Sequence, residues 1–412
     1  MSDAFIYDAV RTPRGKGRAR ENGKPAGALH GIAPHELVSQ LAEAIGARAG
    51  PDALTNVSRM ILGCVGQVGA QGGHLALVSR LTAHRGTALA NDVAVKTINN
   101  YCVSGLSAVN ESALWARAGE DRLSLAGGVE MLSRVPFLAD AADYYSNASL
   151  KSELEWLAPI MGAELMATIE GFDKSSLDEL TLRSHQCADR AWNEGRYDAS
   201  VIPVRDGGGN PVLARDEWIR PDLTMDALEL MPPAFAEAGA DGQDAVMLKH
   251  FPKLAAISHV HSVANTPGLA DGAALVLTGS REAGAAAGLR PRARIVAIAE
   301  TAGDPIFQFG AGFDAMESVL KKAGLGIHQL DLIEFMEAFA APPLKFLRTY
   351  EPDVDKVNVN GGHLAMGHPM GATGAILITT LLHELERRGG ALGMVVALAA
   401  GGIGSAMIIE RV

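Results

Sequence analysis

The chain has 412 residues, of which 48% are apolar, 20% are charged and 5% are aromatic. This composition is typical of a globular protein with two or three domains, or one large compound domain, and it excludes a disordered chain. The formal net charge of −11 argues against nucleic acid or an anionic membrane as a partner for the whole surface.

The cysteines argue against a disulfide framework and against a metal site. Cys64, Cys102 and Cys187 are odd in number and widely spaced, and the chain has no CxxC pair. This pattern favours a reducing, cytoplasmic compartment. The N-terminal segment has no apolar run of signal-peptide length, and no charge-free apolar run is long enough to span a bilayer. We therefore expect a cytoplasmic protein without a metal ion.

The first part of the chain alternates predicted strands and helices, which is typical of parallel sheets covered on both faces. Apolar runs that end in glycine, proline or asparagine predict the strands, and helical apolar spacing predicts the helices. The strands are expected at residues 4–10, 59–66, 94–99 and 123–127, the last ending at its Gly-Gly pair. The helices are expected at residues 34–49, 75–81 and 105–118.

Residues 130–250 break this alternation. They are more polar, hold three of the four tryptophans and contain one clear amphipathic helix, at residues 173–193. We interpret this stretch as a loop domain inserted into an N-terminal domain that spans residues 1–279.

A C-terminal domain is expected at residues 280–412, because the order of elements in the first half returns there. The repeated order suggests an internal duplication. Strands are predicted at residues 273–278, 292–299, 330–335, 394–398 and 405–409, and helices at residues 313–323, 344–350 and 372–388.

The segment KTINNYCVSGLSAV places Cys102 where a predicted strand turns into a helix. Free amides and the helix dipole at such a position favour a thiolate, so Cys102 is a candidate low-pKa nucleophile. The alternative is a buried cysteine that packs as a small apolar residue.

Two glycine-rich segments follow in the second half. VNVNGGHLAMGHPMGATGA holds His368 in a rigid turn, which can fix an imidazole against a nucleophile, although loop histidines are more often structural or exposed. In VALAAGGIGSAMII, the amides around Gly401 and Gly402 can face a substrate oxygen, as in an oxyanion hole. The alternative there is a plain glycine hairpin.

These segments, in this order and together with DAVRTPRGK, EFMEAFAA and HSVANTPGLADG, resemble the thiolase family over essentially the whole chain. The GHP segment is the most specific of them. Two motifs come closest to the trifunctional-enzyme type, which has HEAF and CAAGG where other thiolases have NEAF and CxGGG.

The resemblance implies an α/β, five-layered αβαβα fold of two similar halves with a coenzyme A-binding loop domain. It also implies reversible Claisen chemistry on acyl-CoA, without a permanently bound cofactor. In that chemistry Cys102 accepts the acyl group, His368 takes the thiol proton, and the amides of Cys102 and Ala400 form an oxyanion hole. Residues expected by the same resemblance to contact coenzyme A are Met161, Ser262 and Asn265. The implied partners are a second copy of the chain, as a homodimer or a dimer of dimers, and a hydratase/dehydrogenase subunit.

The chain departs from the family pattern in three places. Met336 stands where thiolases have the Asn or His of an oxyanion hole, and a thioether cannot donate a hydrogen bond. Leu398 stands where thiolases have the second cysteine, which moves the α-carbon proton. Thr266 and Pro267 replace an Ala-Ser pair that helps place coenzyme A, which affects the expected pantetheine contacts.

His363 is a candidate replacement for the missing proton carrier, because the family usually has a small residue there. The alternative is an incidental surface or packing residue.

Three hypotheses follow from these residues. The first is a thiolase-like acyltransferase that uses Cys102 and His368 and is impaired by the loss of the second cysteine. The second is an acyltransferase or hydrolase that performs only the acyl-cysteine half-reaction, which needs no α-proton removal. The third is a non-catalytic, thiolase-fold protein that binds coenzyme A.

Overall fold

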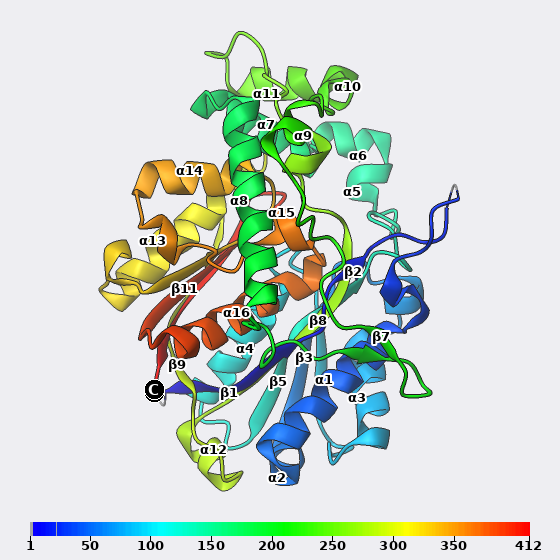
Figure 1. Cartoon of the computed structure of the whole chain (residues 1–412), viewed down its shortest axis with the longest axis vertical. Helices are drawn as coiled ribbons and strands as arrows, with labels where there is room; N and C mark the ends of the chain where they lie inside the picture. Colours follow the sequence, from blue (N-terminus) through cyan, green and yellow to red (C-terminus); the bar gives the residue numbers. More distant parts are fainter. Residues whose placement is uncertain (1–2, 22) are drawn as a thin grey trace.

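The computed structural model describes residues 3–21 and 23–412 and shows a mixed α/β fold around a large sheet (Figure 1). Within these residues the strand order is β10-β11-β12-β9-β1-β8-β5-β3-β4, with β2 added to β8. The strands of this sheet are β1 (Ala4–Arg11), β2 (Gly15–Lys16), β3 (Val57–Gly63), β4 (Ala94–Ile98), β5 (Leu123–Met131), β8 (Ala270–Gly279), β9 (Ala293–Ala302), β10 (Leu332–Phe335), β11 (Leu392–Ala399) and β12 (Ile403–Arg411). A separate pair joins β6 (Val204–Arg205) and β7 (Pro211–Leu213).

The sheet has two halves that are separated by a central layer of helices. α4 (Ser104–Arg117) and α16 (Thr373–Arg388) pack on each other and contact strands of both halves. α1 (Pro34–Ala49) and α3 (Leu75–Gly86) cover the half that runs from β4 to β1, and α13 (Gly310–Ala323) covers the half that runs from β9 to β11. This is the predicted five-layered αβαβα order.

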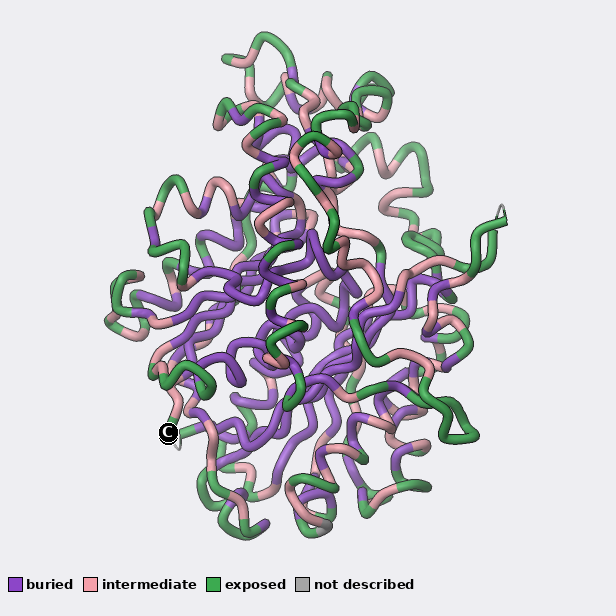
Figure 2. Tube along the Cα trace, viewed as in Figure 1, coloured by how far each residue is buried: buried purple, intermediate pink, exposed green. Residues whose placement is uncertain are grey.

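The burial of α16 follows from its central position. Its residues from Thr373 to Leu385 are all buried, because the helix has sheet or helix neighbours on every side. Figure 2 shows the same gradient for the whole molecule, with buried strands at the centre and exposed backbone concentrated at the periphery. The functional segments at the ends of these elements therefore rest on a rigid core.

Most helices of the inserted stretch form a cap in the upper part of Figure 1, whereas β7 lies lower in the view. The predicted amphipathic helix is confirmed as α8 (Lys174–Asn193). The prediction missed α7 (Pro159–Glu170), whose run of residues from Met161 to Ala167 is buried without a polar face, so no periodic signal marks it. The shorter helices here are α5 (Asp143–Ser146), α6 (Ala148–Glu153), α9 (Met225–Glu229), α10 (Ala236–Ala238) and α11 (Asp244–His250).

The other predicted elements are confirmed, with shifted ends. α3 continues to Gly86 beyond the predicted residue 81, β8 begins at Ala270 and β9 ends at Ala302. Two further strand ends differ as well. β5 does not stop at its glycine pair but continues to Met131, because Gly127 and Gly128 allow other backbone segments to approach closely. β3 ends at Gly63 rather than Gly66, because the amides of Val65 and Gly66 bind a side chain instead of a strand. The remaining helices are α2 (Pro51–Thr55), α12 (Arg281–Ala286), α14 (Ala341–Tyr350) and α15 (His363–Met366).

The C-terminal hairpin is confirmed, since β11 and β12 pair in antiparallel register from Leu392↔Glu410 to Ala399↔Ile403. The turn between them holds Gly401 and Gly402, both with positive φ. Among the described residues, no helix has the length and apolar character needed to cross a membrane.

Candidate active site

Cys102 lies in the turn between β4 and α4, two residues before the helix begins, as the sequence predicts. Hydroxyl groups of the helix hold this turn: Ser104 accepts a hydrogen bond from the amide of Asn100 at 2.8 Å and donates to the carbonyl of Tyr101 at 2.5 Å. Tyr101 adopts a left-handed conformation with φ 47°. The Cys102 side chain is half-buried, whereas Cys64 and Cys187 are buried.

The loop that carries His368 packs directly against this turn. The carbonyl of Gly371 lies so close to Gly63, Gly105 and Gly128 that a Cβ atom at any of the three would clash with it. Three strand and helix ends thus receive the histidine loop because they lack side chains at these points. This close approach joins a segment of the N-terminal half to one of the C-terminal half.

Glu130 fixes the same junction with its buried carboxylate. It accepts hydrogen bonds from the amides of Val65, Gly66 and Gly371, at 2.9, 3.1 and 3.0 Å, and from the side chain of Gln71 at 2.6 Å. The sequence analysis missed this residue, although a carboxylate inside an apolar strand was a usable signal, since buried carboxylates need partners.

His368 is held through one ring nitrogen and its backbone. Its Nδ1 lies 2.8 Å from the hydroxyl of Thr373, and its amide donates to the carbonyl of Gly268 at 2.8 Å. Nε2 is buried without a protein partner. When Nδ1 carries the proton, Nε2 therefore presents a free lone pair, as a general base requires.

Burial makes Cys102 and His368 a neutral pair. Burial and the nearby Glu130 raise the pKa of the Cys102 thiol to about 12, although a backbone hydrogen bond opposes this shift. Burial and Arg14 lower the pKa of His368 to about 3. The expectation of a low-pKa thiol at Cys102 is wrong for this structure, because burial and Glu130 outweigh the one backbone hydrogen bond that lowers the pKa.

Two cavities meet at Cys102. The first, which we call the His368 cavity, is lined by Cys102, His368, Thr266, Pro267 and neighbouring apolar residues. The second, which we call the aromatic cavity, runs from Cys102 toward α5 and α6. Both are also lined by Ala400, in the turn between β11 and β12. The structure thus brings Cys102, His368 and Ala400 together.

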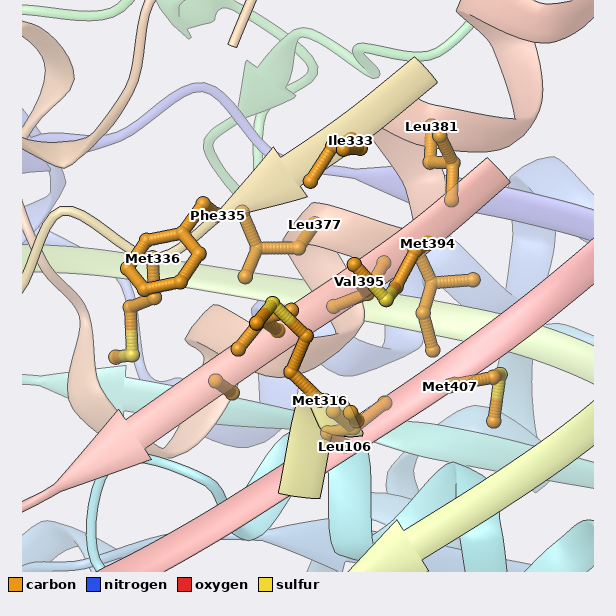
Figure 3. Packing of buried hydrophobic residues seen from close by; sticks show 14 of the residues in the cluster. Leu106, Met316, Ile333, Phe335, Met336, Leu377, Leu381, Met394, Val395 and Met407 are labelled. Atoms are coloured by element: carbon orange, nitrogen blue, oxygen red, sulfur yellow. The ribbon is translucent and has the colours of Figure 1, made fainter. Parts of the chain in front are cut away.

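Met336 and Leu398 line neither cavity within the described chain. Both are fully buried, and the amide of Leu398 donates to the sulfur of Met336 at 3.3 Å. Figure 3 shows Met336 beside Phe335 in the hydrophobic core, and the Leu398 side chain packs against Gly312 of α13. Two positions where the family has polar groups are therefore part of the apolar core.

His363 is fully buried, which rules out the alternative of an incidental surface residue. Its ring lies edge-on to that of His368, with 5.5 Å between the centroids, and neither of its nitrogens has a hydrogen-bond partner. Burial, Arg14, His368 and Arg11 hold its pKa well below the usual range, so the ring is neutral.

The residues expected to contact coenzyme A line neither the His368 cavity nor the aromatic cavity. Met161 is buried in an apolar cluster under the cap. Ser262 donates to Asn265 at 2.8 Å, and Asn265 in turn donates to Asp178 and Thr181, so both side chains are engaged inside the protein. As arranged here, these side chains support the segment that leads to Thr266 instead of facing a ligand.

In the part of the chain that the structure describes, no cluster of His, Cys, Asp and Glu side chains is arranged to hold a metal ion. The cavity between the two sheet halves is lined by a thiol, that of Cys102, and an imidazole, that of His368. A cysteine-dependent acyltransferase requires a thiol nucleophile with an imidazole base beside it.

Comparison with known proteins names the family. The family model described as "Thiolase, N-terminal domain" matches residues 4–242, and "Thiolase, C-terminal domain" matches residues 289–411. The chain belongs to the thiolase family.

Relatives match over the full length. The chain is 33% identical to the beta-ketoadipyl-CoA thiolase of Escherichia coli and 30% identical to the 3-ketoacyl-CoA thiolase of Salmonella typhimurium, with all of each chain covered. Among solved structures, human mitochondrial 3-ketoacyl-CoA thiolase superimposes with a TM-score of 0.84 at 28% identity. The Bacillus anthracis acetyl-CoA acetyltransferase gives 0.81 at 29% identity. Each of the two structural matches covers 100% of this chain and 99% of the other.

Proposed function

We propose that this protein transfers acyl groups from acyl-CoA through an acyl-Cys102 intermediate, and that its Claisen half-reaction is impaired. One observation carries the proposal: Cys102 and His368 line one cavity, whereas Met336 and Leu398 pack in the core. The nucleophile and its base are retained, and the second acid/base of the family is replaced by a hydrocarbon side chain.

The neutral resting pair fits attack with concerted proton transfer. As the Cys102 sulfur bonds to the thioester carbonyl carbon, its proton passes to Nε2 of His368. The carbonyl electrons move onto the oxygen, and in this proposal the amides of Cys102 and Ala400 stabilise the negative charge that forms there. Collapse of this intermediate expels the CoA sulfur, which takes the proton from His368.

Thiolysis of a 3-ketoacyl-CoA, or the reverse condensation, also requires a proton to move at the α-carbon. Leucine has no proton to exchange, and the loss of a positioned acid/base costs about 10²- to 10⁴-fold in rate. His363 is the candidate that would replace it. Its two unpartnered nitrogens support this role, although it reaches the cavity only by way of His368.

Transfer of the acyl group to another acceptor, or to water, needs no α-proton removal. The second candidate function is therefore an acyltransferase or slow hydrolase limited to this half-reaction. The apolar packing of Leu398 favours it. A non-catalytic protein that binds coenzyme A is the third candidate, against which the retained Cys102 and His368 both argue.

Incubation with acetyl-CoA, followed by intact-protein mass spectrometry and peptide mapping, tests the proposal. We expect an acetyl adduct on Cys102 that is absent from the Cys102→Ala variant. An unmodified protein, or an adduct that persists in that variant, would contradict it. Thiolysis of acetoacetyl-CoA, assayed in parallel, then separates the full thiolase from the half-reaction enzyme.

We also propose that the protein is at least a homodimer and is cytoplasmic. β4 ends the sheet order with one edge unpaired among the described strands, and Leu114 and Trp115 on the neighbouring α4 are 53% and 38% exposed. An open edge beside exposed apolar side chains favours pairing with another chain. Sedimentation is expected to show a species of at least twice 43.1 kDa, and a monomer at micromolar concentration would overturn this proposal.

A further inference from the structure

The two cavities at Cys102 differ in what lines them. The His368 cavity contains Thr266 and Pro267, on the segment that resembles the coenzyme A-placing segment of thiolases. The aromatic cavity shares Cys102, Phe137, Pro159, Met370 and Ala400 with the His368 cavity and extends from them to α5 and Trp156. If the thioester enters through the His368 cavity, as the proposed function requires, the acyl group points into the aromatic cavity.

Aromatic side chains line both cavities. Those of the His368 cavity are Phe137, Phe235, Phe309 and Phe339, whereas of the two cavities only the second is lined by tyrosine and tryptophan. The chain has 6 tyrosines, 11 phenylalanines and 4 tryptophans, which is 5% of its residues. The rings that line the cavity are those of Tyr101, Phe137, Tyr144, Tyr145 and Trp156, so half of all tyrosines are here. Aliphatic and proline side chains complete the wall: Val65, Leu132, Val135, Pro136, Leu138, Leu157, Pro159, Pro305 and Met370.

The rings come from separate parts of the chain. Tyr101 precedes the nucleophile, Tyr144 and Tyr145 lie on α5, and Trp156 follows α6. The rings of Tyr145 and Trp156 are tilted at 52° with 6.1 Å between their centroids, which is within the range of aromatic pairs.

The charges at this wall are negative. Among the described lining residues the ionisable acids are Glu130 and Asp140, and no lysine or arginine is present. Asp140 accepts a hydrogen bond from the hydroxyl of Tyr145. Burial, Tyr144, Asp140 and Cys102 together raise the pKa of Tyr101, so this phenol stays neutral. Lys151 places its Nζ 5.0 Å from the centroid of the Trp156 ring, but it does not line the cavity. An acyl group that ends in a carboxylate would therefore lose its hydration at this wall without a lining cation as partner.

We propose that the acyl group that Cys102 accepts is a neutral, ring-containing one, supplied as an arylalkanoyl-CoA, and that the aromatic cavity selects against dicarboxylic acyl groups. This inference rests on the proposed function. It concerns the acyl side of the reaction only, and Tyr144 and Trp156 are the residues that determine the selection.

The test compares rates of Cys102 acylation, measured by mass spectrometry, with 3-phenylpropionyl-CoA, hexanoyl-CoA and adipyl-CoA, and with acetyl-CoA as the reference. We expect 3-phenylpropionyl-CoA to react faster than both longer acyl-CoAs. The Trp156→Ala and Tyr144→Ala variants should lose about 3- to 10-fold with the phenyl substrate, the range of one aromatic contact, and little with acetyl-CoA. Leu154→Ala is the matched control, because Leu154 is 49% exposed near the same helix end and does not line the cavity.

A charge variant tests the proposed selection against dicarboxylic acyl groups. Asp140→Lys should raise the rate with adipyl-CoA, relative to the rate of the same variant with acetyl-CoA, by about tenfold, because it places a cation where the carboxylate ends. An unchanged ratio of these two rates would show that the charge of the wall does not determine the selection.

Binding to the Cys102→Ala variant separates this inference from the proposed function. Calorimetry should show tighter binding of 3-phenylpropionyl-CoA than of hexanoyl-CoA. If the Cys102→Ala variant shows this preference but the natural protein is not acylated, the inference about the aromatic cavity stands and the proposed acyl transfer is overturned. If acetyl-CoA acylates Cys102 but hexanoyl-CoA reacts as fast as 3-phenylpropionyl-CoA or faster, acyl transfer stands and the aromatic selection is overturned. Equal losses of the rates with 3-phenylpropionyl-CoA and acetyl-CoA in Trp156→Ala would also overturn the aromatic selection.

Discussion

The two sides of the site differ in how the core supports them. On one side Cys102 and His368 sit in turns held by hydroxyl groups and by the carboxylate of Glu130, and both reach a cavity. On the other side Met336 and Leu398 contact each other through a sulfur and an amide inside the apolar core. Acyl transfer to a thiol and proton transfer at carbon are separable steps, so the fold can keep the machinery of the first and lose that of the second.

The largest expected effect is loss of the nucleophile. Cys102→Ala should lower the rate of acyl transfer from acetyl-CoA by about 10³-fold or more, because the other groups cannot form the covalent intermediate. The release of free CoA measures this rate. Cys187→Ala is the control, since Cys187 is buried in α8 away from both cavities, and equal losses in the two variants would contradict the assignment.

The second largest effect is expected from loss of the general base, His368. His368→Gln should lower Cys102 acylation by about 10²- to 10⁴-fold, because the thiol then has no acceptor for its proton. In the natural protein the pKa of His368 is about 3 and that of Cys102 is about 12, so neither group changes its charge near neutral pH.

Alkylation by iodoacetamide checks that pH dependence. The rate at Cys102 should rise continuously from pH 6 to pH 10, as the thiolate fraction grows. It should still exceed the rates at Cys64 and Cys187, because these two are buried. A plateau of the Cys102 rate near pH 7 would show that the thiol pKa is low.

Restoring the missing acid/base side chain is expected to raise the rate of thiolysis by up to about 10²-fold. Leu398→Cys should raise thiolysis of acetoacetyl-CoA while changing acylation by acetyl-CoA little, since only the α-proton step needs the new thiol. Met336→His combined with Leu398→Cys should exceed either change alone. If the natural protein catalyses thiolysis at a rate typical of full thiolases, the proposed impairment by Leu398 is contradicted. His363→Ala should then abolish thiolysis, because His363 is the candidate proton carrier.

The smallest effect concerns stability. The pKa of His363 is lowered in the folded state, so below its unfolded pKa of about 6.5 the unfolded chain binds more protons and stability falls with decreasing pH. His363→Ala should make this fall shallower, by at most about 1.4 kcal/mol per pH unit. Urea unfolding at pH 7, 6 and 5 measures it, with the exposed His328→Ala as control. Equal slopes for His363→Ala and the natural protein would show that His363 titrates normally.

Local sequence patterns determined most of the elements and the two motif residues. Apolar periodicity predicts α1, α8 and α16, and glycine-rich turns mark the positions of Cys102 and His368, because strands, helices and turns depend on neighbouring residues. α7 escaped prediction because burial on every side removes its periodicity.

Only the tertiary structure decided the chemistry of the site. The pKa values of Cys102 and His368 follow from burial and from Glu130 and Arg14, which lie far from them in the sequence. The aromatic cavity likewise joins Tyr101 to Trp156 across different elements. Sequence spacing does not determine desolvation or the close approach of distant segments, because both depend on how the layers pack.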